Sequence, residues 1–180
     1  MENQAAAGKP NKRRRRLTVL VSILAIIVAF MILSTLLANW ANRHYADFKV
    51  NGSAMAPALT SGKVVLVKKT TTFRIDDIVV FKITYHSSTP KELIDRVVAL
   101  SGDRVVISGN KLSVYDSSHQ NGYNPSTGYD PNVNTVGNVS LTVPVGYVYV
   151  LGDNRSDSLD SRTFGPLAKS AVIGTVVPGS

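Results

Sequence analysis

The hydrophobic pattern of the chain changes at about residue 40. Residues 17–38 (LTVLVSILAIIVAFMILSTLLA) form a run of 22 positions without a charge. As a helix this run would extend about 33 Å at 1.5 Å per residue, which is enough to cross a hydrocarbon core of roughly 30 Å. The pattern therefore predicts one N-terminal transmembrane helix at 17–38, and a buried soluble helix is the weaker interpretation.

A cleavable secretory signal is the stronger alternative for this run. Such a signal has an apolar core of about 7–15 residues and small residues just before the cleavage site. The run at 17–38 is longer, and each nearby alanine that could precede a cut has a large or polar residue two positions before it. We therefore expect a retained anchor.

Beyond a polar connector at 39–47 the pattern changes to short β-branched runs separated by turn-forming residues. These runs cover residues 63–68, 78–83, 94–100, 104–107, 147–151 and 171–177. Short strands at such spacing predict a mainly β domain, a barrel or a sandwich, over 48–180. The polar, turn-rich stretch 113–138 is interpreted as an insert, either an elaborated loop or a small hairpin lobe.

Charge adds a direction to the anchor. Of the formal net charge of +8, residues 1–16 carry +5 (six Lys and Arg against one Glu) and the rest carries +3. A basic cluster before a first membrane helix favours the cytoplasm for that end. We expect a single-pass plasma-membrane protein with a cytoplasmic tail at 1–16 and an extracytoplasmic main domain. Without basic–aromatic interleaving, nucleic acid is not an expected partner.

Composition also limits the chemistry. The chain has no cysteine, which excludes a cysteine nucleophile and thiolate metal sites. Its histidines, His44, His86 and His119, are far apart in the sequence and give little support to a histidine-based triad or a zinc site. We expect neither a metal nor another cofactor.

Four segments carry the most specific signals. They are G-S-A-M-A-P-A-L at 52–59, D-D-I-V-V-F at 76–81, D-R-V-V-A-L-S-G-D at 95–103 and G-D-N-R-S-D-S-L-D-S-R at 152–162. Taken alone, the last segment could be a polar turn in which Asp160 and Arg162 form an ordinary surface pair. In this order, and behind one apolar run, the four segments resemble those of type I signal peptidases. These are membrane-anchored serine endopeptidases that remove signal peptides from exported proteins.

The resemblance extends from the apolar run to about Gly174. It implies a signal-peptidase-like β-barrel or sandwich whose cleft lies near the membrane surface. It also implies that an extended peptide docks beside a strand and places small side chains, typically alanine, in two shallow pockets. On this basis Gly52, Met55 and Pro57 are expected to bind substrate.

The family's mechanism pairs a serine nucleophile with a neutral lysine as general base. When the family pattern is aligned with this chain, Ala54 stands at the nucleophile position, with Ser53 in the variable place before it. Asp95 stands at the base position. Both catalytic side chains are therefore expected to be absent.

The supporting residues remain. Ser158 matches the family serine that bonds the catalytic lysine, and Asp160 and Arg162 belong to the same motif. We expect Asp95 to accept a hydrogen bond from Ser158 or to pair with a neighbouring arginine.

Three functions stay open. A disarmed family member would bind exported precursors, signal peptides or a secretion or pilus-assembly component without cleavage. An active signal peptidase would use Ser53 as a displaced nucleophile with Asp95 or Lys91 as base, although in an extended segment Ser53 would point away from the cleft. A structural membrane protein would bind no peptide.

Overall fold

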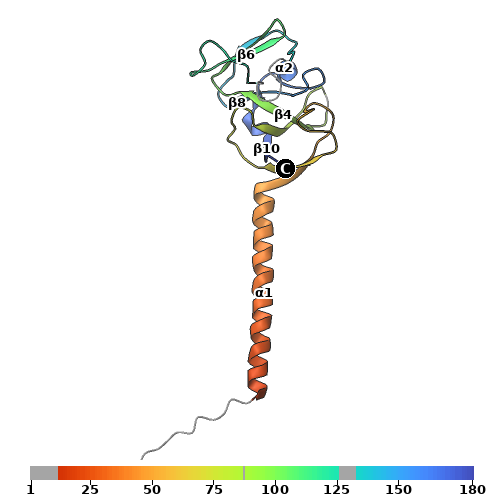
Figure 1. Cartoon of the computed structure of the whole chain (residues 1–180), viewed down its shortest axis with the longest axis vertical. Coiled ribbons are helices and arrows are strands. Elements are labelled where there is room, and N and C mark those ends of the chain that lie inside the picture. The colour runs from red at the N-terminus through yellow and green to blue at the C-terminus, as the bar shows by residue number, and fades with distance from the viewer. Residues whose placement is uncertain (1–11, 87, 126–132) are drawn as a thin grey trace, which may run out of the picture. The chain divides into compact units, whose positions relative to one another are not determined.

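The computed structural model describes residues 12–86, 88–125 and 133–180, and the chain divides into two compact units, Met1–Arg43 and His44–Ser180. The main element of the first is α1 (Lys12–His44), a continuous helix of 33 residues (Figure 1). None of its residues is buried, and its apolar stretch reaches a mean hydropathy of 2.9. By length and composition α1 can cross a membrane.

The polar connector expected at 39–47 is not found. The helix continues to His44, and strand β1 (Tyr45–Lys49) follows at once. Residues 39–44 contain no Gly or Pro to end the helix. The strand exists because Tyr45–Lys49 pairs along its whole length with Val64–Lys68, a tertiary contact that local sequence does not reveal.

The second unit is mainly β, as predicted, and its strands form two antiparallel sheets (Figure 1). The larger sheet has the order β1-β2-β10-β3-β4-β8-β9 and the smaller one β6-β5-β7. Besides β1, the strands are β2 (Val64–Lys68), β3 (Ile78–Ile83), β4 (Lys91–Ala99), β5 (Arg104–Ser108), β6 (Lys111–Tyr115), β7 (Val139–Thr142), β8 (Tyr147–Leu151), β9 (Leu167–Ala168) and β10 (Val172–Val176). Two short helices, α2 (Ser161–Phe164) and the 3₁₀ helix η2 (Lys169–Ala171), complete it.

The insert at 113–138 is only partly irregular. Strand β6 reaches into it as far as Tyr115, and a further bridge joins Val114 to Tyr123. Leu112 and Val114 are buried at alternate positions of β6, which is the period of a strand packed on one face. Part of the insert, residues 126–132, lies outside the described residues.

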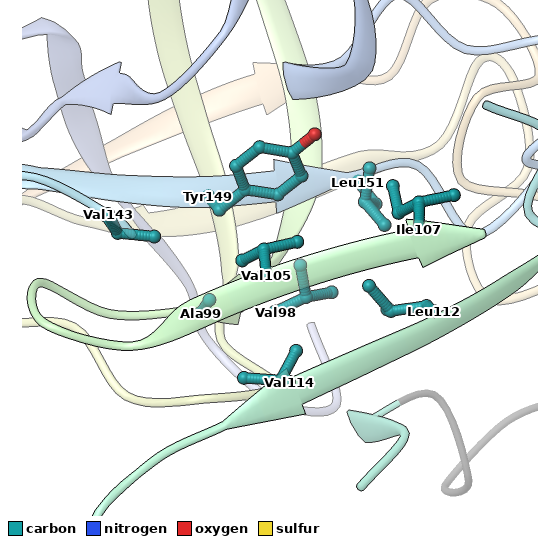
Figure 2. Packing of buried hydrophobic residues seen from close by; sticks show 9 residues of the cluster. All are labelled: Val98, Ala99, Val105, Ile107, Leu112, Val114, Val143, Tyr149 and Leu151. Carbon is teal, nitrogen blue, oxygen red and sulfur yellow. The ribbon is translucent and has the colours of Figure 1, made fainter. Parts of the chain in front are cut away.

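The core consists of three clusters of buried side chains. Figure 2 shows the one between the smaller sheet and β8, in which Val105 and Ile107 of β5 and Leu112 and Val114 of β6 lie on one side of Tyr149 and Leu151. The hydroxyl of Tyr149 points away from the other labelled side chains (Figure 2). Its ring belongs to the apolar core, whereas its oxygen leaves that core.

Candidate functional site

The stretch that contains Ala54 is a turn. Residues 52–59 form successive turns in which the Ala56 N–H donates to the Ser53 carbonyl at 3.0 Å and the Leu59 N–H donates to the Met55 carbonyl at 2.8 Å. The expectation that Ser53 points away from the cleft assumed an extended segment, and that assumption is wrong.

The three residues expected to bind substrate differ in exposure. Gly52 and Pro57 lie on the surface, and Gly52 has a φ of +83°, a left-handed conformation that glycine adopts without strain. Met55 is fully buried and belongs to a core cluster that also contains Ile94 and Val80. The turn therefore exposes Gly52 and Pro57 to solvent and is anchored in the domain by Met55.

The segment Gly152–Arg162 lies against this turn. The Asn154 N–H donates to the Ala54 carbonyl at 2.9 Å, and Asn154 Nδ2 donates to the Ser53 carbonyl at 3.2 Å. The Ser53 hydroxyl donates to the carboxylate of Asp157 in the same segment. These three hydrogen bonds fix the conformation of the turn on either side of Ala54.

Gly152 lies at the closest approach of the two segments. A Cβ atom at this position would lie 2.4 Å from Ser158 Cβ and 2.8 Å from the Ala54 carbonyl oxygen. Both distances are below van der Waals contact, so only glycine fits here without movement of a neighbour.

Asp160 organises the rest of the segment. Its carboxylate is fully buried and accepts hydrogen bonds from the Ser158 hydroxyl at 2.6 Å and from Arg162 Nε and Nη2 at 2.9 and 2.8 Å. It also caps α2 by accepting from the Arg162 N–H. The interpretation of Asp160 and Arg162 as a surface pair is wrong, because the Arg162 side chain is only 13% exposed.

Burial and the neighbouring Asp160 have opposite effects on the pKa of Arg162. Burial alone would lower the pKa of its guanidinium, but the hydrogen bond and charge of Asp160 outweigh burial and raise that pKa. Arg162 therefore stays charged and serves as the permanent counter-ion of Asp160.

A second buried ion pair joins the segment to β4. Arg96 Nε and Nη2 donate to the two carboxylate oxygens of Asp153 at 2.8 and 2.7 Å, a bidentate geometry that fixes orientation as well as charge. The Asp153 side chain is fully buried. Arg155, also buried, donates to the Gly152 carbonyl at 2.9 Å and to the hydroxyl of Thr135.

Asp95 differs from these aspartates. It lies on β4 opposite Val79, is 1% exposed, and its Oδ2 has no hydrogen-bond partner in the described part of the chain. Burial raises the pKa of this carboxyl well above its ordinary value of 3.8. The charges of Asp160 and Asp153 raise it further, against the opposite effect of two nearby arginines.

The expected partners of Asp95 are therefore wrong. Ser158 donates to Asp160 and not to Asp95. Arg96 pairs with Asp153, and Arg162 pairs with Asp160. The raised pKa means that burial favours the protonated, neutral form of Asp95 more than it would at an exposed aspartate.

Two residues of the site were not expected from sequence. Asp157 meets the Ser53 hydroxyl in place of the bases suggested for it, Asp95 and Lys91. Thr135 belongs to the polar insert, yet it is fully buried against Arg155. The sequence holds one sign of Asp157, its place inside the 152–162 motif, and we find no local sign of Thr135.

Comparison with known proteins gives the class of the chain. Residues 16–178 match the model of the signal peptidase family, peptidase S26, and the chain belongs to this family.

Individual relatives agree with this assignment. Signal peptidase I V of Bacillus subtilis (strain 168) is 30% identical over 183 aligned positions, which cover 91% of this chain and 97% of that protein. Signal peptidase I U of the same strain is 28% identical and covers 91% of this chain and 88% of its own length. A crystal structure of a signal peptidase I from Enterococcus faecalis V583 is similar at 24% identity and a TM-score of 0.42, over 59% of this chain and 97% of that one.

Proposed function

We propose that this chain is a membrane-anchored member of the signal peptidase family that binds an exported polypeptide at the Ala54 turn without cleaving it. One observation carries the proposal: Ala54 and Asp95 stand where the family's pattern has its serine and lysine. A methyl group has no lone pair with which to attack a carbonyl carbon. Asp95 also offers a carboxyl group in place of the neutral amine that would accept the proton of the serine hydroxyl.

The size of the loss supports binding over slow turnover. Removal of a nucleophile or base that act together lowers kcat by on the order of 10⁶ in serine proteases. Stabilisation of the carbonyl oxygen by backbone N–H groups does not restore that factor. A chain with both changes would release substrate many times before cutting it.

The turn itself is suited to hold a peptide. Its conformation is fixed by the bonds from Asn154 and Asp157, and the Ala54 N–H donates no hydrogen bond within the described residues. A preorganised backbone donor gives affinity for the main chain of an extended ligand at little entropic cost. The expected ligand class is a signal peptide with small residues, in keeping with the name of the family.

The apolar helix and the charges around it suggest where this happens. If α1 spans the plasma membrane with residues 1–16 in the cytoplasm, the β domain meets polypeptides as they leave the membrane. The partner would then be an exported precursor, or a secretion or pilus-assembly component that handles one.

A second function has one observation in its favour. The Ser53 hydroxyl donates to the Asp157 carboxylate, so a hydroxyl and a proton acceptor are already in contact beside the turn. An active peptidase would use Ser53 as nucleophile. Without an imidazole between them, a carboxylate is a poor base for a hydroxyl, and this favours the non-cleaving function.

The test uses the full chain in detergent micelles and a fluorescent signal peptide with an Ala-x-Ala site. Saturable binding without product is the expected result. Cleavage that is lost in Ser53→Ala would instead establish the second function. Ala54→Ser alone should stay inactive, whereas Ala54→Ser with Asp95→Lys should regain some cleavage.

A matched control separates binding at the turn from adsorption to detergent. Pro57→Ala and Val145→Ala both remove surface carbons, but Val145, which is 91% exposed, lies in the turn before β8 and far along the chain from Ala54. Only the first change should weaken binding of the peptide. Equal loss in both variants, or no binding at all, would contradict the proposed function.

A further inference from the structure

Two buried side-chain atoms in the described part of the chain lack a hydrogen-bond partner, Asp95 Oδ2 and the hydroxyl oxygen of Tyr149. Both groups interact electrostatically with the buried pair of Asp160 and Arg162. Buried polar atoms without partners are rare in folded proteins, and each calls for a physical explanation. Because both atoms belong to groups that interact with the same ion pair, we look for one explanation for both.

The charged groups that face Asp95 come from one segment, Gly152–Arg162. They are Asp153, Arg155, Asp160 and Arg162. On the strands beside it, β3 places apolar Val79 opposite Asp95, and Tyr149 of β8 is neutral. An ionised Asp95 would therefore be the third buried carboxylate in this group.

The guanidinium of Arg162 already donates to acceptors on four residues. It donates to both oxygens of Asp160, to the Ser158 hydroxyl at 3.0 Å, to the Arg155 carbonyl at 2.6 Å and to the Val136 carbonyl at 3.3 Å. An arginine has five N–H donors. Three of these acceptors share the two N–H groups of Nη2, so a negative charge on Asp95 would compete with them for Arg162.

We propose that Asp95 holds a proton that makes the Ala54 turn sensitive to pH, because loss of this proton draws Arg162 toward Asp95 and loosens the segment Gly152–Arg162 from the turn. The inference rests on the proposed function in one respect, that a peptide is bound at this turn. The proton itself follows from the arrangement of the buried groups.

The contacts from Arg162 to the turn are short. Arg162 and Asp160 both bond the Ser158 hydroxyl, and Asp160 accepts from the Gly152 N–H at 3.3 Å. Gly152 in turn lies against the Ala54 carbonyl, with no room for a Cβ between them. A shift of Arg162 therefore reaches the proposed binding site through Ser158 and Gly152.

The first test follows the unfolding midpoint of the full chain in detergent as a function of pH. The folded-state pKa of Asp95 lies above its unfolded value, so its contribution to stability is complete below about pH 4 and is lost as pH rises through the folded value. Asp95→Asn keeps a neutral side chain of the same shape. It should match the wild type at low pH and become more stable than the wild type as pH rises.

Asp47→Asn is the matched control, because it removes one carboxylate from an exposed position of β1. Its stability curve should run parallel to that of the wild type. If the curves of the wild type and of Asp95→Asn were also parallel over the whole range, the proposal would be wrong.

The second test measures the affinity for the fluorescent Ala-x-Ala peptide over the same pH range. In the wild type the affinity should fall by up to about tenfold per pH unit once Asp95 ionises, and in Asp95→Asn this fall should be absent. An affinity that falls equally in both variants would overturn the proposal. A peptide that binds at no pH would contradict the proposed function. The stability curves would still test whether Asp95 holds a proton in the folded protein.

A third measurement detects the proton directly in the wild type. A protonated carboxylic acid has a C=O stretch in the infrared spectrum that a carboxylate lacks. At neutral pH the wild type should show this band, alkali should remove it, and Asp95→Asn should lack it. Its absence from the wild type at neutral pH would contradict the proposal directly.

Discussion

The segment Gly152–Arg162 and the middle of β4 both bury aspartate, and they do so in opposite ways. In the segment, Asp153 and Asp160 each have an arginine at 2.7–2.8 Å. On β4, Asp95 has no such partner and carries a raised pKa. A buried carboxyl group is either paired with a cation or disfavoured in its charged form, and this domain contains both cases. The arginine pairs allow two of the three carboxyl groups to stay charged inside the domain.

The largest effect should come from turning a paired aspartate into a neutral residue. Asp160→Asn leaves the Arg162 charge buried without its counter-ion, and we expect a loss of about 3–5 kcal/mol in the free energy of unfolding. Urea denaturation of the full chain in detergent measures it. Asp47→Asn serves as the exposed counterpart, and a loss of equal size there would show that general charge balance and not pairing is responsible.

Gly152→Ala tests the contact between the segment and the turn. The added methyl group meets Ser158 and the Ala54 carbonyl, so we expect a loss of about 1–3 kcal/mol in stability and weaker peptide binding. The double variant Gly152→Ala with Ser158→Gly removes one of the two clashes. It should recover part of both losses, and a double variant no better than the single one would argue against a steric origin.

Thr135→Val removes a hydroxyl from the insert while keeping the shape of the side chain. Arg155 then loses an acceptor in a buried place, and we expect a loss of about 1–3 kcal/mol. Thermal unfolding of the full chain measures it. Thr72→Val, at an exposed position, is the control. Comparable losses of stability in the two variants would show that the Thr135 hydroxyl has no specific role at the site.

The smallest effect should come from the buried hydroxyl group of Tyr149. Tyr149→Phe deletes a buried hydroxyl that has no partner in the described residues, so stability should change by less than about 1 kcal/mol or rise slightly. A loss as large as that of Asp160→Asn would mean that this hydroxyl is bonded in solution. The contrast between paired and unpaired buried groups would then fail.

Much of the fold follows from local pattern. The strands β3 and β8 begin and end where the runs at 78–83 and 147–151 do, because mostly apolar runs between turn residues leave little choice. The strands β1 and β7 escaped prediction because they are half exposed and exist through pairing with β2 and β5. Pairing between distant segments leaves no mark in a window of ten residues.

The sequence predicts several members of the site, but not Asp157 or Thr135, and it does not predict the hydrogen bonds. The motif at 152–162 identifies Ser158, Asp160 and Arg162, but which of them bonds Asp95 depends on competition in three dimensions. The Ser158 hydroxyl donates to Asp160 because Arg162 holds the Asp160 carboxylate in place as a charged acceptor. The orientation expected for Ser53 has a simpler fault, because residues 52–59 form a turn and not an extended segment.

The tight fit at Gly152 has a consequence for how such chains are sorted by computer searches. This glycine lies against the Ala54 turn, Asp153 joins the segment to β4 and Asp160 binds Arg162 within the segment, and none of these contacts requires that a peptide bond is ever broken. A sequence signature drawn from these positions therefore selects for architecture. Under the proposed function, positions 54 and 95 are the ones that distinguish a cleaving family member from a non-cleaving one, and a survey of genomes should compare them first.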